Sequence, residues 1–263
     1  MVAEAKRLVR LIGVAAAVFA AGAAATVSTA QADTVTPYIV GGEGADIADY
    51  PFTVALTTPD GFQFCGGSLA RANKVVTAAH CVDGSSPAEV QVVSGRTDLT
   101  AAGGETAGVT GIWVHPDYSD PSISADVAVL TLDTSLSATP IDVAGAGDEG
   151  LYAEGTTTTV LGWGATSEGG STSDTLLKVD VPVVSDSDCT TAYSSDYIAD
   201  SMVCAGVPDG GLDSCQGDSG GPLVAGGKLI GAVSWGEGCA RPGKPGVYTR
   251  LASFSSDIEA QLG

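Results

Sequence analysis

The chain has 263 residues, with 31 acidic and 11 basic side chains and a net charge of −20. This length allows one large domain or two small ones. Residues 39–263 alone carry a net charge of −21, from 29 acidic and 8 basic side chains. Such a surface argues against nucleic acid and anionic membranes as partners, and it favours solubility and cationic partners.

The first residues have the pattern of a secretory signal peptide. Three basic residues precede an apolar run from Leu11 to Val27, and residues 30–32 (Ala-Gln-Ala) offer small side chains at the usual cleavage spacing. The run is also near the length of a membrane span, so an anchor is the alternative. Its Ala and Gly content and the cleavage pattern favour removal. We therefore predict a signal peptide over residues 1–32 and a secreted, extracellular protein that does not engage the membrane.

Cysteine usage agrees with export. There are six cysteines: Cys65, Cys81, Cys189, Cys204, Cys215 and Cys239. An even number in an exported chain predicts three disulfides, for which 15 pairings are available. Pairing of nearest neighbours would close loops of about 15 to 25 residues, each contributing on the order of 3 kcal/mol. The chain has no C-x-x-C pair, and thiolates oxidise outside the cell, which argues against a metal site.

Beyond the leader, the sequence alternates short apolar runs with turn residues, which is typical of strands. Four runs rich in apolar or β-branched residues lie at 75–80, 125–132, 156–164 and 228–236. Residues 143–150 are the best candidate for a link between an earlier and a later set of strands. We find no internal repeat. These patterns predict an all-β, disulfide-tied domain.

The C-terminus has a different periodicity. Leu251, Phe254, Ile258 and Leu262 recur at three-to-four spacing. This spacing predicts a helix that packs one apolar face against the core.

Histidine is scarce, so a histidine-dependent reaction must use His80 or His115. His80 follows a strand-like run and precedes Cys81, whose disulfide would hold its backbone. His115 precedes a proline in a polar turn, and we expect it at the surface.

Five motifs come in the order found in the chymotrypsin-family serine proteases. They are IVGG at Ile39, TAAHC at Thr77, DVAVL at Asp126, DSCQGDSGGP at Asp213 and SWGEGCA at Ser234. The chain resembles the trypsins of this family, of the compact bacterial kind found in streptomycetes and other actinobacteria. The resemblance implies two six-stranded antiparallel β-barrels and a C-terminal helix over residues 39–263, with a boundary between the barrels near 143–150.

The resemblance assigns the catalytic roles to His80, Asp126 and Ser219. Ser219 would attack the scissile carbonyl, His80 would take and later return its proton, and Asp126 would orient the imidazole. The backbone N–H groups of Gly217 and Ser219 would form the oxyanion hole.

Further residues match the family's substrate-binding positions: Asp213, Ser214, Gln216, Ser234, Gly236 and Gly246. Asp213 would lie at the base of the specificity pocket and Gly236 and Gly246 in its walls, which predicts cleavage after Arg and Lys. Ser234 would also support Asp126, and with Gly236 it would pair with the substrate backbone.

The resemblance also implies activation by cleavage before Ile39. The new α-amino group would pair with Asp218, leaving residues 33–38 as a propeptide. Tyr38 precedes the cut, and a pocket ending in Asp213 should not accept tyrosine well, so we expect another protease to make it.

No cofactor is expected. Animal trypsins bind calcium in the loop that corresponds to residues 94–105, but Arg96 stands where the first acidic ligand is expected, so this site is not carried over. The 29 acids leave a calcium site elsewhere open. As partners we expect protein or peptide substrates with Arg or Lys at the cleaved bond, an activating protease and proteinaceous inhibitors, with the enzyme itself a monomer. The alternatives are a catalytically silent homologue that acts as a binding protein, or a related hydrolase of other specificity.

Overall fold

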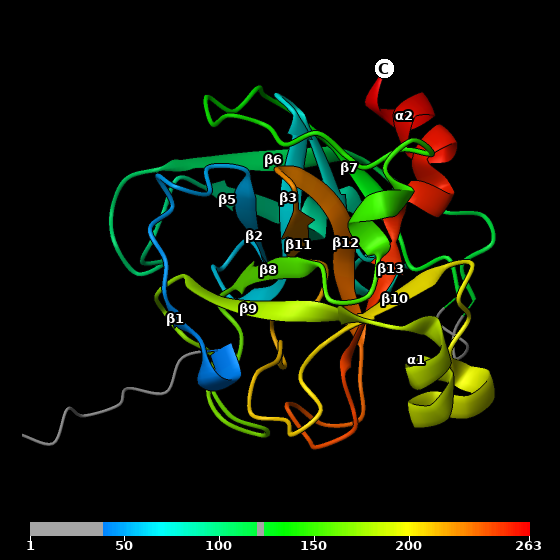
Figure 1. Ribbon diagram of the computed structural model, residues 1–263. Helices are drawn as coiled ribbons and strands as arrows, with labels where there is room; N and C mark the ends of the chain where they lie inside the picture. Colours follow the sequence, from blue (N-terminus) through cyan, green and yellow to red (C-terminus); the bar gives the residue numbers. More distant parts are fainter. Residues whose placement is uncertain (1–38, 120–123) are drawn as a thin grey trace, which may run out of the picture. The chain divides into compact units, whose positions relative to one another are not determined.

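The computed structural model describes residues 39–119 and 124–263. The predicted signal peptide and propeptide lie outside these residues. The described chain is built mainly of strands, with two short α-helices and several single turns of 3₁₀ helix (Figure 1).

The first six-stranded barrel closes in the order β2-β3-β4-β7-β6-β5. Its strands are β2 (Thr53–Thr57), β3 (Gln63–Arg71), β4 (Lys74–Thr77), β5 (Gln91–Ser94), β6 (Glu105–Val114) and β7 (Ala128–Leu132). All neighbouring strands run antiparallel. Valine and leucine side chains such as Val54, Val75 and Leu130 fill the interior and are fully buried. Closure removes the exposed sheet edges that would otherwise invite aggregation.

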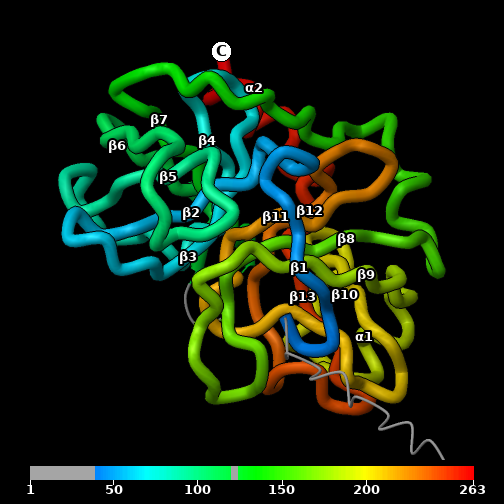
Figure 2. The backbone as a smooth tube through the Cα atoms, turned by 90° about the vertical axis from the view of Figure 1, so that its left-hand side faces the viewer, coloured from blue at the N-terminus to red at the C-terminus, as the bar shows by residue number. Residues whose placement is uncertain are grey.

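The second barrel follows after a long connection. Its strands are β8 (Thr157–Gly162), β9 (Leu177–Val184), β10 (Met202–Ala205), β11 (Pro222–Ala225), β12 (Lys228–Trp235) and β13 (Gly246–Arg250). Pairing of β8 with β9 closes the ring β9-β10-β13-β12-β11-β8. Along β9, the apolar residues 177, 179, 181 and 183 alternate with more exposed positions, as expected for a strand with one face on a core. Figure 2 shows the strands of the two barrels as separate groups.

The prediction of two six-stranded antiparallel barrels is confirmed, with one addition. The short strand β1 (Glu43–Gly44) pairs with β9 outside the second barrel. It follows the 3₁₀ turn η1 (Ile39–Gly41), in which the Ile39 side chain is fully buried in the core of the second barrel.

The helices lie outside the barrels. The predicted C-terminal helix is present as the 3₁₀ turn η6 (Leu251–Phe254) followed by α2 (Ser255–Leu262). Its apolar residues Leu251, Ile258 and Leu262 are buried in a cluster that draws on both barrels. Helix α1 (Asp186–Tyr193) is preceded by Ser185, whose hydroxyl accepts a hydrogen bond from the Asp188 amide and so caps the first turn. The remaining 3₁₀ turns are η2 (Ala79–Cys81), η3 (Pro87–Glu89), η4 (Glu149–Tyr152) and η5 (Ser194–Asp196).

All six cysteines form disulfides, as predicted. The pairs are nearest neighbours in sequence: Cys65–Cys81, Cys189–Cys204 and Cys215–Cys239. One bond lies in the first barrel and two lie in the second.

His115 is not a surface residue, so this expectation was wrong. Only 5% of His115 is exposed. Its ring packs edge-on between Trp113 and Phe254, and its Nε2 lies 3.4 Å from an Asp257 oxygen. The polar residues next to His115 in sequence do not predict these contacts, because two of the partners belong to η6 and α2, some 140 residues later.

Candidate active site

His80 and Asp126 are held together at the edge of the first barrel. His80 lies in η2, directly after β4, and Asp126 lies just before β7. The His80 Nδ1 is 2.8 Å from Asp126 Oδ2, and the His80 backbone N–H donates to Asp126 Oδ1 at 2.9 Å. A carboxylate only accepts, so Nδ1 carries a proton and the lone pair of Nε2 is left to take another.

Asp126 is only 1% exposed, and the second barrel supplies part of its support. The Ser234 hydroxyl on β12 donates to Asp126 Oδ2 at 2.6 Å. The Thr249 hydroxyl on β13 donates to the Asp126 backbone oxygen, also at 2.6 Å. The position of Asp126 is therefore fixed by hydrogen bonds from both barrels.

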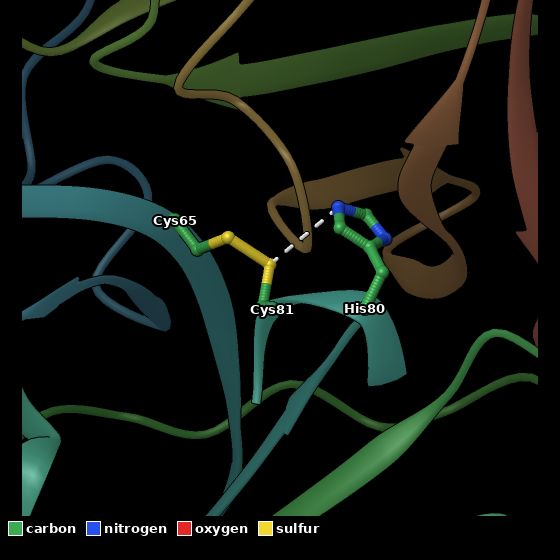
Figure 3. Close-up of side chains that lie close together, drawn as sticks. All are labelled: Cys65, His80 and Cys81. Atoms are coloured by element: carbon green, nitrogen blue, oxygen red, sulfur yellow. Dashed lines mark hydrogen bonds between the residues drawn. A yellow bond between two sulfur atoms is a disulfide. The ribbon is translucent and has the colours of Figure 1, made fainter. Parts of the chain in front are cut away.

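His80 also faces the Cys65–Cys81 disulfide (Figure 3), with Nε2 3.8 Å from the Cys81 sulfur. These three side chains are close enough together to resemble a metal-binding cluster. Both sulfurs are joined in the disulfide, however, and so provide no thiolate ligand. The disulfide instead ties the turn that carries His80 to β3.

Ser219 lies in a tight turn between the two barrels. Its backbone oxygen accepts a hydrogen bond from the Gly66 amide on β3 at 2.7 Å. The following residue, Gly220, has a φ of +75°, and a Cβ built there would lie 2.1 Å from Thr77 Oγ1. Only glycine allows this approach, which brings the turn against the segment leading to His80. In the described part of the chain no hydrogen bond joins Ser219 Oγ to His80, as is common before substrate binds.

The same turn presents backbone donors. Gly217 has a φ of +97°, and its carbonyl accepts from the Gln63 side chain at 2.8 Å. Among the described residues, the N–H groups of Gly217 and Ser219 donate to no protein atom. Both are therefore free to stabilise a developing oxyanion.

A cavity opens beside Ser219, and all six predicted substrate-binding residues line it: Asp213, Ser214, Gln216, Ser234, Gly236 and Gly246. Sequence reasoning missed several others, namely Val233, Trp235, Gly238 and the Cys215–Cys239 disulfide, which forms part of the wall.

The Asp213 carboxylate is 4% exposed and accepts a hydrogen bond from the Ala240 amide at 2.9 Å. Burial raises its pKa to about 6. None of the described Lys or Arg side chains forms an ion pair with it. A Cβ on Gly246 would lie 2.5 Å from Asp213 Oδ1, so the wall must be glycine if the carboxylate is to keep its place.

Asp218, next to Ser219, is fully buried. Its two oxygens accept from the amides of Gly164 at 2.8 Å and Cys215 at 2.9 Å. Burial raises its pKa to about 7, with a further contribution from nearby Asp213. Near it, the carbonyl of Val40 accepts from the Asp213 amide at 3.2 Å, so the segment that follows Ile39 contacts the pocket directly.

An ion-pair network adjoins the cavity wall at Cys239, and no sequence motif pointed to it. Arg241 pairs with Glu168, whose carboxylate also accepts from the Cys239 amide at 3.3 Å. Lys244 pairs with Glu237 and donates to the carbonyl of Ala192 in α1. The network joins the 164–173 loop, the 236–245 loop and α1. Glu237, Arg241 and Lys244 lie close together in sequence, but their partners Glu168 and Ala192 are 73 and 52 positions away, so only the folded chain reveals the network.

The loop that corresponds to the calcium loop of animal trypsins does not fit a calcium ion. The Arg96 guanidinium spans it and donates to the carbonyl of Gly103 at 2.7 Å. Two nearby carboxylates already have partners, because Asp98 accepts from Thr100 and Glu105 accepts from Ser137. A cationic side chain and occupied carboxylates are the wrong donor set for this ion.

A sequence model of the trypsin family matches residues 39–258, from the buried Ile39 to α2. A trypsin from Saccharopolyspora erythraea is 58% identical over 224 residues, which cover 85% of this chain and 98% of the relative. The chain belongs to the trypsin family. Trypsin-1 from Astacus astacus is 44% identical over 84% of this chain and 99% of its own length. A vitellin-degrading protease from Bombyx mori is 39% identical over 85% of both chains.

Membership of the trypsin family makes this chain a serine endopeptidase, a hydrolase that acts on protein or peptide substrates. Among the described residues, no helix is long and apolar enough to cross a membrane.

Proposed function

We propose that the enzyme cleaves peptide bonds after Arg and Lys. The observation that supports this most directly is Asp213, a buried carboxylate at a cavity that Ser219 also lines, with no cationic partner among the described residues. A substrate guanidinium or ammonium that enters the cavity would provide that partner. The glycines at 236 and 246 leave space for its long aliphatic stem.

The proposed reaction uses three side chains. Ser219 Oγ attacks the scissile carbonyl carbon while His80 Nε2 takes its proton, and the imidazolium is stabilised by Asp126 at 2.8 Å. The amides of Gly217 and Ser219 stabilise the oxyanion. His80 then protonates the leaving amine, and water hydrolyses the acyl-enzyme by the same path.

The specificity is tested by replacing Asp213. The Asp213→Ser enzyme and the unchanged enzyme are compared on matched Arg, Lys, Phe and Leu peptides, with a serine-reactive inhibitor as control. Loss of one partner of a buried ion pair costs roughly 3 to 5 kcal/mol. We therefore expect kcat/KM for Arg and Lys peptides to fall by about two to three and a half powers of ten. Unchanged kcat/KM for Arg and Lys would refute the proposal.

We further infer that the enzyme is made as an inactive precursor and is activated by cleavage between Tyr38 and Ile39. The supporting observation is Asp218, fully buried and held only by backbone amides among the described residues. A free α-ammonium group on Ile39 would neutralise it and stabilise the turn around Ser219. A precursor that is fully active while uncut, or one that cuts itself at Ile39 without any other protease, would contradict this view.

Secretion is proposed on the leader pattern of residues 1–32 and on the three disulfides, which persist in oxidising compartments. The enzyme is further proposed to act as a monomer without a cofactor and to be the target of inhibitors that present Arg or Lys to the pocket. N-terminal sequencing of the protein from culture medium tests secretion and maturation together. The expected N-terminus is Ile39.

A further inference from the structure

We propose that the bond between Arg96 and Thr97 is the first bond that this enzyme cleaves in its own chain, and that this cut inactivates it. The inference rests on the proposed cleavage after Arg and Lys. Residues 39–263 contain eight such side chains: Arg71, Lys74, Arg96, Lys178, Lys228, Arg241, Lys244 and Arg250. Seven of them are protected by their position in the fold or by a following proline.

Five of the eight lie in strands: Arg71, Lys74, Lys178, Lys228 and Arg250. Four of these are followed by a residue that is at most 3% exposed: Val75, Val179, Leu229 and Leu251. The fifth, Arg71, faces Lys74 across a two-residue turn and pairs with Glu259 of α2. A protease needs an extended, accessible segment, and the first four bonds become one only if a barrel opens. The Arg71–Ala72 bond is followed by an exposed residue, but it is held in a tight turn, where the Ala72 carbonyl accepts from the Leu136 amide at 2.7 Å.

Two more, Arg241 and Lys244, directly precede prolines. Trypsin-like enzymes cut such bonds poorly. Both side chains are also engaged in ion pairs, with Glu168 and Glu237 respectively, so neither is free to enter a second molecule's pocket.

Arg96 differs from the other seven. It lies in the loop between β5 and β6, is followed by Thr97 rather than proline, and neither residue is fully buried. The adjoining residues 100–104 are all exposed, and surface loops are where proteolytic cuts concentrate. Among the peptide bonds that follow a basic residue in residues 39–263, the Arg96–Thr97 bond is therefore the most susceptible to proteolysis.

The loop has contacts that slow such a cut. Arg96 Nε donates to the Gly103 carbonyl at 2.7 Å, which keeps the guanidinium on its own loop. The Thr97 carbonyl accepts from Leu176 N at 2.7 Å and from Trp163 Nε1 at 3.2 Å. Cleavage therefore requires these hydrogen bonds to open, so the lifetime of the enzyme depends on the stability of this one loop.

The cut is an ordinary turnover with a second copy as substrate. Ser219 of one molecule attacks the Arg96 carbonyl carbon, the bond to Thr97 N breaks, and the new Thr97 amine takes the proton from His80. Water then releases Arg96 as a free carboxylate. None of the three disulfides spans the cut, because Cys65–Cys81 lies before it and the other two lie after it. His80 is thereby separated covalently from Asp126 and Ser219, and the fragments 39–96 and 97–263 are held only by packing and hydrogen bonds.

The test is to incubate purified active enzyme at high concentration and to follow activity, fragment masses and new N-termini. We expect Thr97 as the first new N-terminus, appearing in step with the loss of activity. The two fragments should separate on a denaturing gel without reductant. A first cut after any other Arg or Lys, or loss of activity without a cut, would overturn the proposal.

Three variants sharpen the test. Arg96→Gln removes the cleavable residue and should lengthen the active lifetime severalfold. Arg96→Lys keeps a cleavable residue but loses the guanidinium bond to Gly103, and it should be cut about fivefold faster, as expected for the loss of one hydrogen bond. Lys178→Gln, a half-buried basic residue in β9, is the matched control and should leave the lifetime unchanged.

The proposed specificity is read out separately on short Arg and Lys peptides. An enzyme that cleaves those peptides but never yields Thr97 would overturn this inference alone. An enzyme that cleaves neither peptide would overturn the proposed specificity first.

Discussion

Asp213 and Asp218 are buried carboxylates five positions apart, on either side of the Cys215–Gly217 segment. Neither has a cationic partner among the described residues, and burial raises the pKa of both. A protein rarely keeps such groups unless something else neutralises them. In the proposed mechanism two different cations do so, a substrate side chain at Asp213 and a new α-amino group at Asp218.

The pKa of Asp213 gives a prediction at the residue scale. Because its pKa is raised to about 6, the carboxyl is ionised at neutral pH and becomes protonated as the pH falls below about 6. A small arylguanidinium inhibitor should therefore bind more weakly below pH 6, by up to about tenfold per pH unit. Binding is measured by calorimetry between pH 4.5 and 8. The residual binding of the Asp213→Ser enzyme should lack this dependence, and the same pH profile in both proteins would contradict the assignment.

At the scale of elements, most residues that line the pocket lie in loops, and the others come from β12 and the start of β13. Glu168 joins the 164–173 loop to Arg241 and to the Cys239 amide, so it acts as a positioning residue for the pocket wall. Gln216, which also lines the cavity and contacts the Cys239 sulfur, accepts from the Gly169 amide of the same loop at 3.3 Å. One loop thus restrains two segments that line the cavity, those around Gln216 and Cys239.

We expect Glu168→Gln to raise KM for Arg peptides by up to about fivefold and to leave kcat unchanged, since exposed ion pairs contribute up to about 1 kcal/mol. The effect should shrink at high salt, which screens such pairs. Steady-state kinetics at low and high ionic strength measure both. Glu43→Gln, which breaks a similar exposed pair with Lys178 on β9, is the control and should change neither constant. A fall in kcat with KM unchanged would argue against a positioning role.

At the scale of the whole molecule, the candidate site exists only where the barrels meet. His80 and Asp126 come from the first barrel and Ser219 from the second, and Thr249 of β13 donates to the Asp126 carbonyl across the junction. Correct alignment therefore depends on bonds between the barrels as well as on the stability of each.

Thr249→Val tests this dependence with little change in volume. It leaves the buried Asp126 carbonyl without its donor, which costs about 1 to 3 kcal/mol. We expect kcat to fall by about tenfold or more while arylguanidinium binding is retained. Thr158→Val is the matched control, because Thr158 is fully buried and its hydroxyl donates to the Val181 carbonyl at the same 2.6 Å but within the second barrel. Equal losses of kcat in the two variants would mean that the junction has no special role.

The stability of the uncut chain should also depend on pH. Asp218 has a pKa of about 7 when folded and about 4 when unfolded, so between these values the folded chain holds a proton that the unfolded chain has lost. The free energy of unfolding should then fall as the pH rises from about 4 to about 7. Asp213 contributes in the same direction up to about pH 6.

Denaturant titrations of the uncut Ser219→Ala chain across this range measure the effect. Asp218→Asn in the same background should remove the decrease in the free energy of unfolding above pH 6. A chain that starts at Ile39 should also lack this decrease, because its ammonium group stabilises the ionised carboxylate. An uncut chain whose stability rises between pH 6 and 7 would contradict the assignment to Asp218.

Much of this molecule could be predicted from local patterns. The all-β class and the C-terminal helix follow from such patterns, whereas the two barrels and the residues around Ser219 follow from the resemblance of five motifs to the chymotrypsin family. The missed features depend on contacts between distant segments. The Glu168–Arg241 pair joins residues 73 positions apart, and His115 is buried by Phe254, which a reading of its polar neighbours does not reveal. The strand β1 has only two residues, too few to show a period.

The close approach of Gly246 to Asp213 has a consequence for how such an enzyme can change over generations. A side chain at 246 would collide with the carboxylate at 2.5 Å, so that substitution is harmful as long as Asp213 is present. A smaller residue at 213 removes this most severe clash, after which a Cβ at 246 would still lie 3.0 Å from the Tyr248 hydroxyl. A lineage that leaves the proposed specificity would therefore lose its charge selectivity before it narrowed the cavity, and intermediates on that route would have a wide, uncharged pocket.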